Sequence, residues 1–129
     1  MQNFKEILDK STLKATPQRL AILKELESNG HSNIDEIYEN VKAIFPSISL
    51  ATIYKNIISL KEENIITEVC HPKKNKYEVK KEPHAHFICR KCGEVEDIDL
   101  DNALTDELIQ NYPNSTKELY IYGLCDKCS

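Results

Sequence analysis

Two Cys-x-x-Cys pairs constrain the fold of this chain more than any other feature of its sequence; they are Cys89 with Cys92 and Cys125 with Cys128. Such a turn brings two thiolates to one cation at about 2.3 Å, and two turns complete the tetrahedral shell of a structural zinc site. The 32 residues between the pairs exceed the roughly 15–20 of a simple zinc ribbon. We therefore expect a strand and a helix inside the loop that the metal closes.

Disulfide bonds and a redox-active Cys-x-x-Cys pair are the alternatives to zinc. No hydrophobic signal segment opens the chain, so we expect a reducing cytoplasmic location and no membrane association. Zinc is therefore the favoured interpretation. The fifth cysteine, Cys70, ends an apolar run typical of a strand, and we expect it to be a small buried side chain.

Charge is distributed unevenly along the 129 residues. Residues 1–80 carry 12 Lys and Arg against 11 Asp and Glu, whereas residues 81–129 carry 5 against 10. This difference predicts two modules with different roles, residues 1–80 and residues 81–129. A pI near 5.6 argues against non-specific coating of nucleic acid and leaves open site-directed contacts by a few residues.

Capping signals predict a series of helices in the first half. An apolar stripe at residues 4–13 predicts one helix, and Thr16 with Pro17 predicts the start of another that ends near Gly30. A capping-box-like segment, residues 32–35, precedes a further helix that ends before Pro46.

Ser49 is the predicted cap of a last helix in this half, residues 50–61. Its inner face would consist of four apolar residues, Leu50, Ile53, Ile57 and Leu60. Two strands, at residues 65–70 and 76–79, would follow as a hairpin. Helices followed by a two-stranded ribbon predict a winged helix, which binds DNA through the last helix and the ribbon. A generic helical core with solvated lysines is the alternative.

The second half predicts a small mixed domain. Residues 94–100 alternate as in a strand, Asp101 could cap a helix, and residues 119–122 make a further strand. The predicted class is therefore α+β, with an N-terminal winged helix-turn-helix domain and a small C-terminal α/β dimerisation domain that holds structural zinc. Large apolar residues are so few here that we expect stability to require metal and a partner subunit.

A second cluster of metal ligands directly precedes the first cysteine pair. His84 and His86 alternate along a predicted strand, so their imidazoles lie on one face, with Cys89 and Cys92 in the turn that follows. Neutral imidazoles suit Fe, Mn, Zn or Ni and do not choose among them.

Three segments resemble those of the ferric uptake regulator (Fur) family. They are Ala-Thr-Pro-Gln-Arg at residues 15–19, Ser-Leu-Ala-Thr-Ile-Tyr-Lys-Asn at 49–56 and His-Ala-His-Phe-Ile-Cys-Arg-Lys-Cys-Gly at 84–93. Tyr-Gly-Leu-Cys at residues 122–125 closes the pattern. The resemblance covers nearly the whole chain. It implies a homodimeric, metal-dependent transcriptional repressor with a winged-helix half and an α/β dimerisation half.

The resemblance also implies a regulatory metal site, with the ligands His31, Glu78, His84, His86 and Asp97. These ligands come from both halves, so one cation would fix the orientation of the halves across a hinge at residues 79–83 and select the DNA-competent arrangement. We expect permanent Zn(2+) at the cysteines and exchangeable Fe(2+) or Mn(2+) at this mixed site.

For DNA, the resemblance implies that Lys14 enters a narrow, A·T-rich minor groove and that Tyr54 and Lys55 face the major groove. Thr52 lies on the same outward face of the predicted helix, and Arg19 is expected at a phosphate. A dimer would require a palindromic double-stranded operator.

Within the family, the pattern is closer to the peroxide-stress regulators (PerR). Ala85 and Leu124 stand where iron-responsive members often carry residues of a further metal site. In peroxide sensors Fe(2+) reacts with hydrogen peroxide and a ligand histidine is oxidised, here His31 or His84. These sensors typically have aspartate at the position of Glu78, so sensing of iron or manganese level alone is the alternative.

Two other classes of protein fit less well. A catalytic zinc keeps an open position beside a base, whereas the four-cysteine site is closed. The sequence also has no nucleophile motif such as Gly-x-Ser-x-Gly. We therefore do not expect an enzyme. A zinc-stapled protein-interaction module is the remaining alternative.

Overall fold

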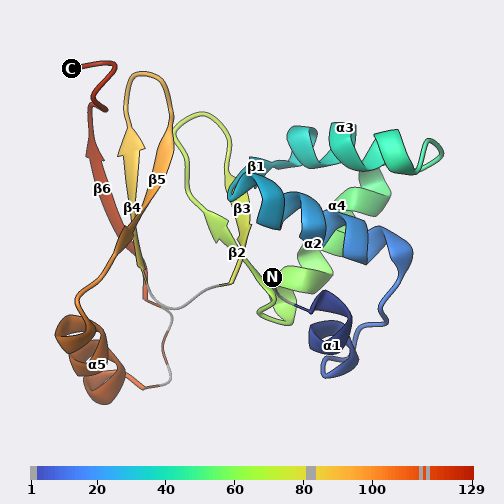
Figure 1. The fold of residues 1–129 in the computed structure, drawn as a ribbon, viewed down its shortest axis with the longest axis horizontal. Coiled ribbons are helices and arrows are strands. Elements are labelled where there is room, and N and C mark those ends of the chain that lie inside the picture. The colour runs from blue at the N-terminus through green and yellow to red at the C-terminus, as the bar shows by residue number, and fades with distance from the viewer. Residues whose placement is uncertain (1–2, 81–83, 114, 116) are drawn as a thin grey trace. The chain divides into compact units, whose positions relative to one another are not determined.

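The computed structural model describes residues 3–80, 84–113, 115 and 117–129, and the chain divides into two compact units (Figure 1). The first unit contains residues 1–70 and 74–80, and the second contains residues 71–73 and 81–129. Residues 81–83 of the predicted hinge lie outside the described residues.

Side-chain caps begin the helices of the first unit. Its elements are α1 (Phe4–Asp9), α2 (Pro17–Asn29), β1 (Ser32–Asn33), α3 (Ile34–Ile44), α4 (Leu50–Glu62), β2 (Ile66–Val69) and β3 (Lys76–Val79). Thr16 and Ser49 accept backbone N–H groups from the first turns of α2 and α4, as predicted. The capping box of α3 joins Asn33 and Glu36, one residue later than the predicted segment.

The three strands of the first unit form an antiparallel sheet in the order β1-β3-β2. The β2–β3 hairpin is the predicted wing, and it follows α4 directly along the chain (Figure 1). The first strand, β1, contains two residues and was not predicted.

One continuous apolar core fills the first unit. Its buried members are Phe4, Leu8, Ile22, Leu23, Leu26, Ile37, Val41, Ile53, Ile57, Leu60, Ile65, Ile66 and Val79. The prediction for Leu50 was wrong, because this side chain is 44% exposed. Leu50 is the first residue of α4, one turn beyond the buried layer that begins at Ile53.

The second unit is a three-stranded sheet with one helix. Its elements are β4 (His84–Cys89), β5 (Val95–Asp99), α5 (Asn102–Asn111) and β6 (Leu119–Gly123), as the sequence predicted. The central strand β4 pairs antiparallel with β5 and parallel with β6. Asp101 caps α5 by accepting the N–H of Ala103. The α+β class and the winged-helix arrangement are therefore confirmed.

Two cysteine predictions were wrong. Cys70 is exposed, because β2 ends at Val69 and Cys70 belongs to the loop that follows. Cys89 is the last residue of β4 and is fully buried, so that only Cys92 of its pair lies in the turn. Among the described residues, no helix is long and apolar enough to cross a membrane.

Candidate metal centres and nucleic-acid interface

Four cysteine sulfurs of the second unit converge on one point. The Sγ atoms of Cys89, Cys92, Cys125 and Cys128 all lie within 4.8 Å of one another. Those of Cys92 and Cys125 are 3.7 Å apart. Tetrahedral zinc with bonds of about 2.3 Å requires sulfurs about 3.8 Å apart. The cluster thus has the donor type and spacing of a closed zinc site.

Pairing between β4 and β6 brings the two cysteine turns together. Cys89 lies opposite Gly123, and the N–H of Arg90 donates to the Gly123 carbonyl at 2.8 Å. The first turn closes where the N–H of Gly93 donates to the Cys89 carbonyl at 2.9 Å. Gly93 has a φ of +79°, a conformation that favours glycine.

Hydrogen bonds within this cluster give Cys89 and Cys128 very different pKa values. Cys89 Sγ accepts the N–H groups of Cys92 at 3.5 Å and Cys125 at 3.4 Å. These backbone donors lower the pKa of Cys89 to about 5. Hydrogen bonding to Cys125 raises the pKa of Cys128 to about 12. A divalent cation at this cluster would bind each cysteine as the thiolate.

A second group of ligand atoms lies on the β4–β5 ribbon of the second unit. His84 Nε2 and His86 Nε2 are 3.1 Å apart, and each is 3.5 Å from Asp97 Oδ1. The β4–β5 register places His86 directly opposite Asp97. Ligands at about 2.1 Å from one ion are about 3.0 to 3.4 Å apart in octahedral or tetrahedral geometry. These three side chains therefore have the spacing of three metal ligands.

The first unit holds a separate pair of ligand atoms. His31 Nε2 lies 2.8 Å from Glu78 Oε2, and Glu78 is only 1% exposed. A buried carboxylate is unfavourable unless it has a charged or hydrogen-bonding partner. His31 and Glu78 thus form a buried pair with one imidazole and one carboxylate donor.

The short strand β1 creates this pair. Ser32 lies opposite Tyr77 in the β1–β3 register, which brings the preceding residue, His31, beside Glu78. Alternating hydrophobicity cannot reveal a two-residue strand, so the sequence predicted the two ligands and missed the element that joins them.

The outward face of α4 carries the residues predicted to contact DNA. Thr52, Tyr54 and Lys55 are exposed, and the Tyr54 side chain is 53% exposed. The Thr52 hydroxyl lies 3.0 Å from that of the cap residue Ser49. Lys14 is also exposed, two residues before the cap of α2. All four side chains are therefore accessible within the first unit.

Polar contacts attach the wing to α4 and α3. Glu68 on β2 accepts hydrogen bonds from Lys61 on α4 and from Asn75 Nδ2 in the wing turn. The hydrogen bond from Lys61 lowers the pKa of Glu68 and raises that of Lys61. Lys74 of the turn pairs with Asp35 on α3. These contacts hold the wing on the helical core.

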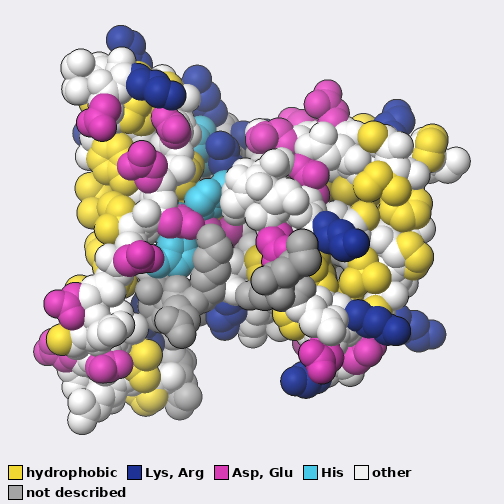
Figure 2. Space-filling model, in the orientation of Figure 1, with side chains coloured by type: hydrophobic (Ala, Val, Ile, Leu, Met, Phe, Trp, Pro, Cys, Tyr) yellow, Lys and Arg dark blue, Asp and Glu magenta, His cyan; other side chains and the backbone are white. Residues whose placement is uncertain are grey.

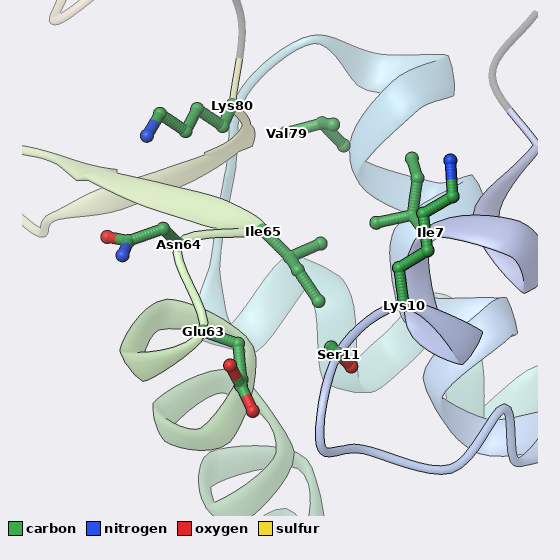
Figure 3. Close-up of a pocket in the computed structure, with 8 residues that line it drawn as sticks. All are labelled: Ile7, Lys10, Ser11, Glu63, Asn64, Ile65, Val79 and Lys80. Atoms are coloured by element: carbon green, nitrogen blue, oxygen red, sulfur yellow. The ribbon is translucent and has the colours of Figure 1, made fainter.

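A pocket of about 380 Å³ lies elsewhere in the first unit (Figure 3). Its apolar lining consists of Ile7, Ile65 and Val79, and the amino group of Lys80 points away from Ile65. Active-site pockets combine apolar walls with a few convergent polar groups. This pocket does not bring together ligand atoms as the two clusters of the second unit do.

Comparison with known proteins finds similar regulators and repressors. The model of the ferric uptake regulator family matches residues 10–122. The peroxide-responsive repressor PerR of Staphylococcus epidermidis is 33% identical, over 94% of this chain and 85% of that protein. The Campylobacter jejuni peroxide stress regulator is 38% identical over 98% of this chain and 100% of that one, with a TM-score of 0.76. The Vibrio cholerae ferric uptake regulator is 27% identical over 95% and 100%, with a TM-score of 0.73.

Proposed function

Because the chain belongs to the ferric uptake regulator family, we propose that it is a metal-dependent repressor of peroxide-stress genes that binds double-stranded DNA as a homodimer in the cytoplasm. The convergence of His84, His86 and Asp97 on one point is the observation that carries the metal dependence. The relatives compared above are named as repressors and regulators, which supports a role outside catalysis.

Zn(2+) at the four cysteines holds the second unit together, and a second cation, Fe(2+) or Mn(2+), controls DNA binding. His31 and Glu78 supply two ligands of this regulatory site, and His84, His86 and Asp97 supply three. Three nitrogens and two carboxylates suit these cations, although the donor set does not choose between them. Since the ligands come from both units, binding favours whichever arrangement of the units lets all five reach one ion. A ligand of greater affinity for that arrangement shifts the population toward it.

DNA binding uses α4 in the major groove, with Tyr54 and Lys55 at the bases and Thr52 nearby. Lys14 enters the adjacent minor groove, where A·T-rich sequence narrows the groove and strengthens its negative potential. A twofold-symmetric dimer reads a palindromic operator. The exposure of these side chains in the first unit supports this assignment.

Exposed apolar residues of the second unit support the dimer. They are Leu104, Ile109, Tyr112, Leu119, Ile121, Tyr122 and Leu124. Among the described residues of α5 none is buried. Figure 2 shows hydrophobic side chains at the surface of this unit. Burial of such a surface against a partner subunit would lower its free energy relative to exposure to water.

A sensor of iron or manganese level is a second candidate function, and Glu78 favours it. This carboxylate is buried beside His31, and glutamate is one methylene longer than the aspartate of the peroxide-sensor pattern. A carboxylate that binds through both oxygens would fill the position that hydrogen peroxide needs. The two functions differ in chemistry at the same ligands.

Hydrogen peroxide treatment of the Fe(2+)-loaded and Mn(2+)-loaded protein distinguishes the peroxide sensor from the metal-level sensor. For a peroxide sensor we expect loss of DNA binding and one added oxygen atom on a peptide that contains His31 or His84, in the iron form alone. The peptide with His71, which is outside the proposed ligand set, is the internal control and should keep its mass. Unchanged binding in both forms would establish the metal-level sensor. Absence of metal-dependent DNA binding in any form would overturn both.

A further inference from the structure

Arg19, in the first turn of α2, connects two parts of the first unit that are proposed to touch DNA. Its Nε donates to Asn56 Oδ1 on α4 at 3.2 Å, and its Nη1 donates to the backbone carbonyl of Lys14 at 3.0 Å. The guanidinium is planar and holds its donors in a fixed fork. Arg19 therefore fixes the distance and direction between the Lys14 backbone and α4.

Asn56 is itself held in place. Its Nδ2 donates to the carbonyl of Thr52, one turn earlier on α4, at 3.1 Å. This bond orients the amide so that Oδ1 faces Arg19. Asn56 directly follows Lys55, so the contact with Arg19 falls on the stretch of α4 that carries the proposed base contacts.

The Lys14 backbone receives a second contact. Its carbonyl also accepts the N–H of Thr16 at 2.9 Å, and Thr16 Oγ1 accepts the N–H of Arg19 at 3.3 Å. The segment from Lys14 to Arg19 thus forms a closed set of hydrogen bonds, from which the exposed Lys14 side chain extends.

We propose that Arg19 is a positioning residue, which sets Lys14 in register with α4, and not a phosphate ligand as the sequence predicted. The inference rests on the proposed DNA-binding function. Both acceptors of the guanidinium are neutral protein groups, and the geometry of a fork is needed to reach them together. A phosphate can be bound by lysine as a point charge, whereas these two acceptors cannot both be reached by one ammonium group in the place of the fork.

Arg19→Lys is the decisive substitution, because it keeps the charge and removes the fork. The probe is a duplex selected from a random-sequence library by the Mn(2+)-loaded wild-type protein. We expect Arg19→Lys to lower affinity about ten-fold, the effect of a lost hydrogen bond to a charged group. The dependence of log K on log salt should keep its wild-type slope. Asn56→Ala should have the same effect, and the double variant should bind no more weakly than either single one.

Preference for A·T over G·C base pairs at the minor-groove position is the readout that a change in stability alone would not move. Lys14→Ala, Arg19→Lys and Asn56→Ala should all reduce this preference, whereas Lys55→Ala should keep it. Full binding by Arg19→Lys, together with a salt slope reduced by about 1 in Arg19→Gln, would identify a phosphate contact and overturn the proposal. Failure of the wild-type protein to select any duplex would instead overturn the proposed function.

Discussion

The two units of this protein obtain their stability from different sources. The first has one core of 13 buried apolar residues. In the described part of the second, the buried apolar residues are Ala85, Ile88 and Cys89, and four cysteines stand at the ends of its strands and turns. A unit with its own core can keep its shape without metal, whereas a unit organised around ligands responds to metal supply. The comparison predicts that loss of zinc unfolds the second unit and leaves the first unit folded.

Removal of zinc should have the largest effect, and it should unfold the second unit while the first stays folded. Zinc contributes about 10–16 kcal/mol in small zinc-finger peptides, more than a unit with so small a core can replace. We expect Cys92→Ser to abolish amide hydrogen-exchange protection across β4, β5 and β6 while α2 and α4 keep theirs. Cys70→Ser is the matched control and should exchange as the wild type does. Protected β4 amides in metal-free Cys92→Ser protein would contradict this division.

A cavity in the core of the first unit should have a large and local effect. Ile57 and Ile58 are neighbours on α4, with exposed fractions of 1% and 42%. Ile57→Ala should lower the free energy of unfolding of the first unit by about 2–5 kcal/mol and leave bound zinc unchanged. Ile58→Ala should change it by less than about 0.5 kcal/mol. Urea denaturation followed by the helical signal, with a measurement of bound zinc, tests both variants. Equal losses of stability in the two would show that the inner face of α4 is assigned wrongly.

Removal of the α3 cap tests whether the first unit contributes to metal binding. Asn33→Ala should cost about 1 kcal/mol of stability. Asn33 also belongs to β1, which sets His31 beside Glu78, so we expect weaker Mn(2+) binding. Ser49→Ala removes a similar cap from α4 and should leave Mn(2+) affinity as it was. Isothermal titration calorimetry measures the Mn(2+) affinity of both variants. Equal affinities would exclude a role for β1.

Neutralising Glu68 should have the smallest effect. Its pKa is lowered in the folded protein, so its contribution is present above the unfolded value of 4.5 and is lost as the pH falls through the lower folded pKa. Because Glu68 and Lys61 are partly exposed, we expect Glu68→Gln to cost at most about 1 kcal/mol at pH 7. Wild-type and variant curves for the first unit should converge in acid. A difference that persists below the folded pKa would have another cause.

Sequence alone predicted those features that depend on local chemistry. Thr16, Ser49 and Asp101 were identified as caps because a short polar side chain at a helix start accepts backbone N–H groups. The cysteine spacing predicted the zinc cluster, since donor type and turn length fix its geometry.

The errors concern features that depend on tertiary context. Cys70 and Leu50 have apolar neighbours in sequence, yet Cys70 follows the last residue of β2, Leu50 is the first residue of α4, and both are exposed. The strand β1 exists because its two residues pair with β3, Asn33 with Lys76 and Ser32 with Tyr77, which are 43 and 45 positions apart in sequence. The hydrogen bond from Arg19 to Asn56 likewise joins residues 37 positions apart, and the motif around Arg19 does not distinguish a positioning role from a phosphate contact.

The parallel pairing of β4 with β6 also determines when, during synthesis, the zinc cluster can form. The first unit is complete once residue 80 has emerged, whereas the zinc cluster waits for Cys128. At about 5–20 residues per second, this delay lasts about 2–10 s on the ribosome. Cys89 and Cys92 are made during that interval and await Cys125 and Cys128 for the rest of it. Zinc can therefore complete its four-cysteine shell only at the end of synthesis.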